Sequence, residues 1–483
     1  MIFSMCDSKK NVPSSSKKPN GVPDIIKIYK KKHDWKEILS YYGITKFNEK
    51  LDENISIAEL NEIFFAAGHY VYVLNASSRN KKSFKQVLLL YFWTYDTTKH
   101  WLTKYPESLA ILRSYAYINY ELSTGFGYNL TKKAKKIGLN DNDVNKKLAG
   151  LKRNAYSEAR SAYEKILKSN EMDIKSHYRY ARLLKKEYTA SGYKFSAEVK
   201  HNDGKLINWH FLKVKRLYES LLDKEKKQMY FSCYIKSLYN YAAYTFDVIL
   251  PSLSLRLLLN AEKYNKIFYI PQKSQDGIEW KNDKIKNARL YLEKAAQLAH
   301  CELKPLNNED ISRIAIIQEP FILPIYFFYT YAKMFYAVSI LYTSSKKEFK
   351  KYREAHPEES DKKADEYLSL AAEYCQYAIN IRRTRKRHGF SDSDGIYPEI
   401  DLLGKIYTIM CFRTGNGEKI SKLYENKPKN DDIKFYHAIC LYYLDQTKNH
   451  DTCIKLLKEI KSRQYKAKAE QEIEYINNGN KEG

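Results

Sequence analysis

Apolar residues recur at intervals of three and four along most of the chain, with polar residues between them. This spacing places the apolar side chains on one side of an α-helix. The strict alternation of apolar and polar residues that is typical of β-strands is absent, and 17 Gly and 12 Pro are few for a protein built on tight turns. We therefore predict an all-α fold.

Polar, charged or glycine-bearing stretches interrupt the helical pattern at five places, where we expect loops or insertions. They are residues 124–154, 189–208, 265–283, 344–361 and 388–398. None is long enough to indicate a separate domain, so the pattern favours one array of helix pairs with irregular insertions.

A local motif returns along the helices: a large residue, two variable ones, a large and a small residue in succession, two variable ones and a final large residue. The small residue matters because it lets a second helix approach closely. The motif occurs at residues 112–119, 177–184, 328–335, 400–407 and 436–443. A companion motif, small-x-x-x-large-x-x-apolar, occurs at residues 159–166, 288–295 and 453–460.

Together the two motifs resemble the tetratricopeptide repeat, a helix–turn–helix unit of about 34 residues. The copies that begin at Ile400 and Tyr436 are 36 residues apart, close to one unit. The resemblance implies a right-handed α-α superhelix (a TPR-like solenoid) of antiparallel helix pairs. The first helices of the pairs would line a concave groove that binds a partner.

The pattern divides the chain into four parts. Residues 1–34 are polar and lysine-rich, which predicts a flexible basic tail. Residues 35–130 are predicted to be an N-terminal helical region with the first repeat-like hairpins, and residues 155–470 the repeat region. A polar last helix at residues 451–475 would cap the array, and residues 471–483 are predicted to be a disordered tail.

The net charge indicates which classes of partner the protein would attract. The chain has 83 Lys+Arg against 57 Asp+Glu, a formal charge of +26, and 44 of its 483 residues are Tyr. Lys, Asn, Ile and Tyr all have A/T-rich codons, so codon usage is one source of the lysine excess. A positive field of this size attracts acidic proteins, nucleic acid or anionic surfaces.

The cysteines and the most apolar segment indicate the compartment. Seven cysteines are widely spaced without a CxxC pair, which argues against a disulfide framework or a zinc ribbon and favours a cytoplasmic protein. Residues 321–342 are long enough to span a bilayer, but Pro324, Lys333 and five tyrosines dilute the segment. We expect a buried member of a helix pair there, and no membrane span.

Motifs of common catalytic and metal sites do not occur. The chain has no GxxxxGK[ST] and no HExxH sequence, and Gly125-x-Gly127 lacks the third glycine of a dinucleotide-binding loop. Asp141-x-Asp143 begins like a calcium loop, but Lys146 stands where that loop needs glycine. We therefore predict a protein that is not an enzyme and has no cofactor and no metal.

The resemblance also indicates which residues would line the groove. They are Arg113, Tyr117, Lys175, Tyr178, Arg182, Lys185, Lys405 and His437. A basic and aromatic lining suits an acidic or extended protein segment, or single-stranded nucleic acid with stacked bases. For each tyrosine, packing between helices is the competing interpretation. The Lys/Asn carboxylate clamp of chaperone-tail-binding relatives is absent at these positions.

The sharpest local feature is a cluster of five cations after the predicted helix at residues 364–381. It comprises Arg382, Arg383, Arg385, Lys386 and Arg387. Guanidinium groups grip phosphate or carboxylate through paired hydrogen bonds, which makes these residues candidate anion ligands. Cations at a helix C-terminus are also stabilised by the helix dipole, so a structural role is the alternative.

The same stretch contains Arg383-x-x-x-x-His388, which resembles the Arg-x4–6-His motif of HEPN-type ribonucleases. That resemblance implies that the two side chains flank the scissile phosphate. Thr384 departs from the amide or acidic residue that usually follows the arginine in this family. The favoured hypothesis is a non-enzymatic scaffold or adaptor that binds an acidic or extended protein partner. An RNA-binding repeat protein is the alternative, and an HEPN-like ribonuclease is a weaker one.

Overall fold

The computed structural model describes residues 22–123, 142–190, 197–249, 278–317, 322–342, 356–390 and 398–479, with isolated positions between 130 and 138. Within these ranges the chain forms 18 helices and no β-strand, which confirms the predicted all-α class. The chain divides into two compact units, Met1–Leu206 and Ile207–Gly483.

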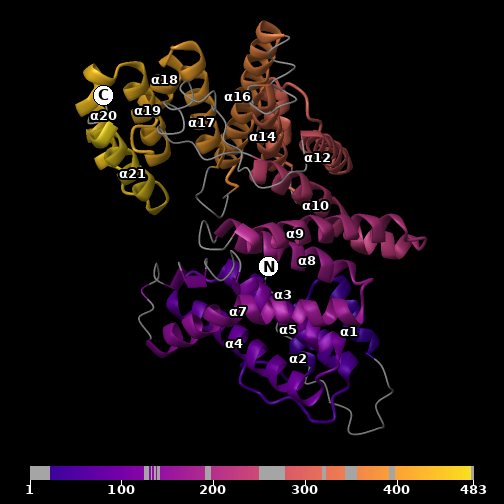
Figure 1. Cartoon of the computed structure of the whole chain (residues 1–483). Helices are drawn as coiled ribbons and strands as arrows, with labels where there is room; N and C mark the ends of the chain where they lie inside the picture. The colour runs from indigo at the N-terminus through magenta and orange to yellow at the C-terminus, as the bar shows by residue number, and fades with distance from the viewer. Residues whose placement is uncertain are drawn as a thin grey trace, which may run out of the picture. The chain divides into compact units, whose positions relative to one another are not determined.

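Helices of the first unit (Figure 1) are α1 (Asp24–Lys31), α2 (Trp35–Tyr41), α3 (Ile57–Ser77), α4 (Lys81–Lys104), α5 (Leu109–Ser123), α7 (Asn142–Ser169) and α8 (Ile174–Ala190). Helix α9 (Ala197–Glu219) begins in this unit and ends in the second. From α3 to α8 each helix packs on the next along the chain. In addition, α3 packs on α5 and α5 on α8, so alternate helices also touch.

Local sequence sets where two of these helices begin. At the start of α3, Ser56 Oγ accepts a hydrogen bond from the Glu59 N–H (3.2 Å), and the Glu59 carboxylate accepts one from the Ser56 N–H (3.1 Å). Asn80 and Ser83 form the same reciprocal pair at the start of α4. Such capping boxes satisfy backbone N–H groups that the first helical turn leaves without partners. Pro106 lies in the short connection between α4 and α5, as its inability to continue a helix predicts.

Helices of the second unit follow one another from magenta to yellow in Figure 1. They are α10 (Lys224–Ile249), α12 (Ile278–Leu298), α13 (Asn308–Ala315), α14 (Pro324–Tyr342), α16 (Pro357–Arg387), α17 (Pro398–Thr414), α18 (Glu418–Asn426), α19 (Asp431–Leu444), α20 (Gln446–Lys458) and α21 (Arg463–Gly479). Alternate helices again touch: α10 packs on α14, α14 on α17, α17 on α19 and α19 on α21. Helix α12 packs on α10 and α14, α16 on α14 and α17, α18 on α17 and α19, and α20 on α19 and α21.

The apolar segment at residues 321–342 contains the whole of α14, which packs along α16 as predicted for a buried member of a helix pair. Lys333, which argued against a membrane helix, is buried and forms an ion pair with Asp247 of α10. Its ammonium also lies 4.3 Å from the centre of the Tyr329 ring. None of the described helices is both long and apolar enough to cross a bilayer.

Small residues of the repeated motif are buried between helices. Ala116, Ala181 and Ala332 are fully buried. Gly404 of α17 is the extreme case, because a Cβ atom built at this position would lie 2.5 Å from Cδ2 of Tyr436 in α19. The motif therefore predicted the packing role of its small position correctly.

Both ends of the chain differ from the prediction. Residues 24–31, expected to belong to a flexible tail, form α1, because Ile26 is buried against the rest of the unit. Residues 471–479, expected to be disordered, complete α21, whose Ile476 is also fully buried. The single cap helix predicted at residues 451–475 is instead two helices, α20 and α21. Residues 1–21 and 480–483 lie outside the described ranges.

Candidate functional site

The predicted cation cluster lies at the C-terminal end of α16, whose termination follows from local sequence. His388 caps the helix, and Gly389 adopts a positive φ of +80° that glycine tolerates without strain. The Gly389 and Phe390 N–H groups donate to the carbonyls of Lys386 (3.2 Å) and Arg385 (3.1 Å). This pair of bonds is the Schellman motif, which stops a helix at a defined residue. The last turn of α16, and the cations on it, are therefore held in place.

Arg382 is a structural residue. Only 6% of it is exposed, and its guanidinium makes a paired contact with Glu399 in the first turn of α17, which is 1% exposed. One of the two hydrogen bonds, from Arg382 Nη2 to Glu399 Oε2, measures 3.3 Å. A carboxylate in the first turn is also stabilised by the helix dipole of α17. The pair joins α16 to α17.

Arg385 is a second structural residue. Its Nη1 donates to the carbonyl oxygens of Ala315 (2.8 Å) and Ile317 (3.2 Å), at and just beyond the end of α13. Its guanidinium also lies 4.6 Å from the centre of the Phe390 ring. Arg382 and Arg385 thus bind groups of the protein itself, which corrects their assignment as anion ligands.

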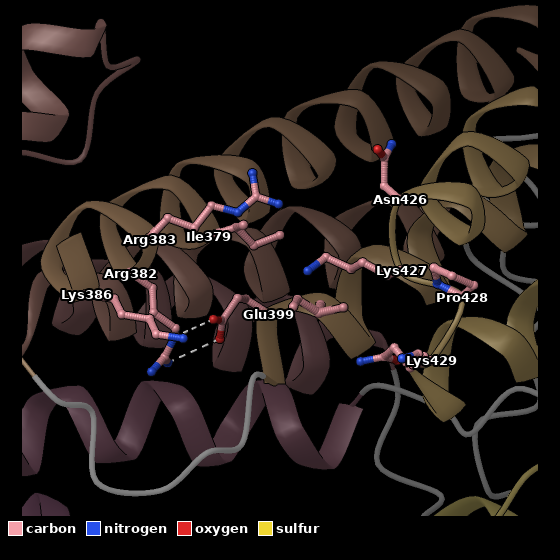
Figure 2. Close-up of a pocket in the computed structure, with 11 residues that line it drawn as sticks. Ile379, Arg382, Arg383, Lys386, Glu399, Asn426, Lys427, Pro428 and Lys429 are labelled. Carbon is pink, nitrogen blue, oxygen red and sulfur yellow. Dashed lines mark hydrogen bonds and ion pairs between the residues drawn. The ribbon is translucent and has the colours of Figure 1, made fainter.

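Three members of the cluster line a cleft with a volume of about 670 Å³: Arg382, which is paired with Glu399, and Arg383 and Lys386. Figure 2 shows Arg383 and Lys386 on the α16 side and Lys427 and Lys429 on the segment between α18 and α19. We call these four residues the cleft cations. Sequence analysis missed Lys427 and Lys429, which lie some forty residues after the cluster in the sequence Lys-Pro-Lys-Asn. The short lysine-bearing connection between two helices was the only signal for them.

Backbone hydrogen bonds hold the Lys427–Asn430 segment in one conformation. The Lys427 N–H donates to the Tyr424 carbonyl (2.9 Å), and the Asn430 N–H donates to the Lys427 carbonyl (3.0 Å). Asn430 Oδ1 accepts from the Ile433 N–H (2.9 Å) and so caps α19. Both walls of the cleft are therefore set by helix-capping interactions.

The cleft is electropositive. Burial lowers the pKa of Lys427, and the nearby Arg383 charge lowers it further, against an opposing effect of Glu399. Among the described residues, no carboxylate forms an ion pair with any of the cleft cations. The Glu399 carboxylate also lines the cleft, but it is engaged by Arg382.

Arg387 and His388 are exposed and are not among the residues that line this cleft. Arg383, the arginine of the ribonuclease-like motif, does line it. The cleft therefore contains one of the two side chains of that motif.

In the first unit, the predicted groove residues of α5 and α8 lie on adjacent helices. Arg113 of α5 forms an ion pair with Asp173 at the start of α8 (2.5 Å). The Arg179 guanidinium, which sequence analysis did not select, lies 4.0 Å from the centre of the Tyr117 ring. Arg182 is exposed and donates to the hydroxyl of Tyr178 (3.3 Å), which is itself only 8% exposed. Lys175 and Lys185 are half-buried on the same helix.

The pKa of His69 is lowered in part by the positive charges at this face. His69 lies on α3, next to α5, and its pKa is lowered to about 4 by burial and then by the positive charges of Arg179 and Lys175, among others. We call the surface formed by α3, α5 and α8 around Tyr117 and Arg179 the basic helix face.

Lys405 and His437, predicted to continue the groove, bind within the second unit. Lys405 forms an ion pair with Asp401 one turn earlier on α17 (2.8 Å). The His437 ring is 9% exposed and stacks on Tyr424, with 4.4 Å between ring centres. Local contacts engage both side chains, so the predicted groove lining is corrected at these two positions.

We expect His437 to make the stability of the second unit pH-dependent. Burial lowers its pKa to about 4, whereas an unfolded histidine titrates near 6.5. Between these values the unfolded chain binds a proton that the native state does not, so acid favours unfolding. We expect the contribution of His437 to be complete above pH 6.5 and to be lost as the pH falls toward 4.

The measurement is urea unfolding of the wild type and His437→Phe between pH 7 and pH 4. Phenylalanine keeps an aromatic ring against Tyr424 but does not titrate. The wild type should lose more stability than the variant over this range. Equal losses would contradict the assignment.

No three His, Cys, Asp or Glu side chains come together in the described part of the chain in a way that could hold a metal ion. The six described cysteines form no disulfide. No protein-family model matches the chain, and no curated protein sequence is similar enough to indicate a relative. Function is therefore inferred from the geometry of the chain itself.

Proposed function

We propose that the protein is a non-enzymatic helical-repeat adaptor that binds an acidic protein segment on the basic helix face. It would be a right-handed superhelix of antiparallel helix pairs, and the cytoplasm would be its compartment. The observation that carries the proposal is the packing of α5 on α3 and α8, which places Arg179 of α8 over the Tyr117 ring of α5 and Arg182 of α8 within 6.0 Å of the centre of the Tyr120 ring of α5.

Packing of alternate helices supports the repeat architecture. In a superhelix of helix pairs, the first helix of each pair contacts both its own partner and the first helix of the next pair. Helices α3, α5 and α8 stand in this relation in the first unit, and α10, α14, α17, α19 and α21 do so in the second. The repeated sequence motif falls on five of these helices: α5, α8, α14, α17 and α19.

The state of the aromatic residues favours an acidic protein segment over RNA. Single-stranded nucleic acid binds by stacking its bases on open aromatic faces. Here a guanidinium already lies on the Tyr117 ring, and Tyr178 is buried. On this face Arg182 is exposed and Arg179 is half-buried, and guanidinium groups suit carboxylate side chains.

A binding experiment with two probes tests the proposal. A fluorescein-labelled glutamate-rich peptide and a uridine oligonucleotide of equal charge would be titrated with the protein and followed by fluorescence anisotropy. We expect the peptide to bind, and Arg179→Glu/Arg182→Glu to weaken it by about tenfold or more, because two attractive charges become repulsive.

The matched control is Lys165→Glu/Lys168→Glu, which makes the same change in net charge at two exposed lysines of α7. This control should leave peptide affinity within about twofold, since two-fold is only about 0.4 kcal/mol. Equal losses in the two variants would contradict the basic helix face as the binding site. Tighter binding of the oligonucleotide, falling steeply with salt, would instead support the RNA-binding alternative.

A further inference from the structure

The second unit contains a feature that the adaptor proposal does not use. Five cations from two segments line one cleft. Arg382 is paired with Glu399, and within the described chain none of the other four, the cleft cations, forms an ion pair with a carboxylate. Most other cations near the end of α16 are accounted for: Arg382 by Glu399, and Arg385 by the carbonyls at the end of α13.

Unneutralised charges at close range repel each other, and the repulsion is strongest where water is partly excluded. Lys427 is half-buried, and the charge of Arg383 acts on it across the cleft. A bound anion would replace this repulsion with attraction. Anion binding in the cleft would relieve this repulsion, whereas a single cation on an open surface has no such repulsion to relieve.

The arrangement of the charges restricts the ligand. Arg383 and Lys386 belong to α16, and Lys427 and Lys429 to the opposite wall, so positive charge lies on both sides of the cleft (Figure 2). A single carboxylate brings one negative charge to one wall. A ligand with two or more phosphate groups brings several charges and can contact both walls at once.

The size of the cleft and its apolar lining residues also favour a small organic ligand with several phosphate groups. Its volume of about 670 Å³ lies within the usual range for small-molecule sites. Ile379, Ile400 and Pro428 supply apolar surface beside the cations, which can contact the carbon skeleton of an organic ligand. Both cation-bearing segments are already held by capping interactions, so binding needs little reorganisation.

We propose that this cleft binds a small organic polyphosphate, with Arg383 and Lys427 as the main phosphate ligands and Lys386 and Lys429 at the rim. The site lies within the second unit and is independent of the basic helix face. A chain with this cleft would respond to a phosphorylated small molecule as well as to a protein partner.

Isothermal titration calorimetry of the full chain tests the proposal, with inorganic tripolyphosphate as the probe and inorganic phosphate for comparison. We expect one site per chain and tripolyphosphate affinity at least about tenfold above that of phosphate. Arg383→Gln and Lys427→Gln should each weaken tripolyphosphate binding by about tenfold, because each removes charged hydrogen bonds to the ligand. Both side chains are at least partly exposed, and a circular-dichroism melt would verify that the variants are folded.

Arg387→Gln is the matched control, since Arg387 is an exposed arginine of the same helix end that does not line the cleft. It should leave the affinity unchanged, as should Arg179→Glu/Arg182→Glu in the first unit. Failure of the adaptor proposal would therefore leave this result intact. An affinity loss in Arg387→Gln equal to that in Arg383→Gln would overturn the proposal, and so would the absence of tripolyphosphate binding. A phosphoserine peptide that binds the cleft more tightly than tripolyphosphate would overturn it in favour of a phosphoprotein partner.

Discussion

Replacing Glu399 with alanine is expected to lower the free energy of unfolding of the second unit by about 3–5 kcal/mol. Arg382 and Glu399 are both almost fully buried, at 6% and 1% exposure. Removing the carboxylate leaves the guanidinium of Arg382, a residue that is only 6% exposed, without its counter-charge. The cost is therefore mainly the desolvation of a charge without its counter-charge. Chemical denaturation followed by circular dichroism measures it.

Two controls separate this cause from other effects. Glu418→Ala breaks an exposed ion pair with Lys422 on α18 and should cost less than about 1 kcal/mol. The double variant Arg382→Met/Glu399→Leu removes both charges and should recover most of the lost stability, because buried ion pairs are often replaceable by apolar residues. If Glu399→Ala were no more destabilising than Glu418→Ala, the pair would not be the link between α16 and α17 described above.

Substitution of alanine for Gly404 is expected to cost about 2–3 kcal/mol, the upper part of the range for overpacking a core. The added Cβ would lie 2.5 Å from the Tyr436 ring. That ring cannot easily move, since it is 1% exposed and its hydroxyl binds both Asp401 (2.9 Å) and the Tyr465 hydroxyl (2.7 Å). Helices α17 and α19 would have to separate.

The same substitution at Gly150 is the control. Gly150 lies in α7, is exposed, and has no atom within 4 Å of a built Cβ. Gly150→Ala should stabilise the protein by about 0.5–1 kcal/mol, because alanine lowers the entropy cost of the helix. A second test combines Gly404→Ala with Tyr436→Ala, where the cost of the glycine substitution should largely disappear. A Gly404→Ala variant as stable as Gly150→Ala would rule out close packing as the reason for the glycine.

The two proposed sites divide the positive charge of the chain into parts with different roles. Arg382 and Arg385 stabilise the fold, whereas Arg383 and Lys427 face a cleft. Arg113 lies between these extremes, since it pairs with Asp173 but is still partly exposed. The net charge of +26 therefore combines cations with different roles, and only a few of these side chains belong to the two proposed binding sites.

The sequence by itself determined the helical class and the places where helices pack closely. Both properties depend on residues that are near each other in the chain: the three-to-four spacing of apolar positions, and a small residue beside a large one. Ala116, Ala181 and Gly404 were identified in this way, and all are buried at helix contacts. Local motifs also set some helix starts, as Ser56 and Glu59 do for α3, although this start was not among the predictions.

Only the tertiary structure decided the partner of each charged side chain. Arg382 and Arg383 are neighbours in sequence and both line the cleft, but only Arg382 is paired with buried Glu399. Adjacent residues on a helix point about 100° apart, so their surroundings come from different helices. Lys427 was not predicted because it meets Arg383 only through the packing of separate helices. His437 likewise stacks on Tyr424 of another helix. Long polar side chains take their roles from whatever the fold brings beside them, and that depends on segments far along the chain.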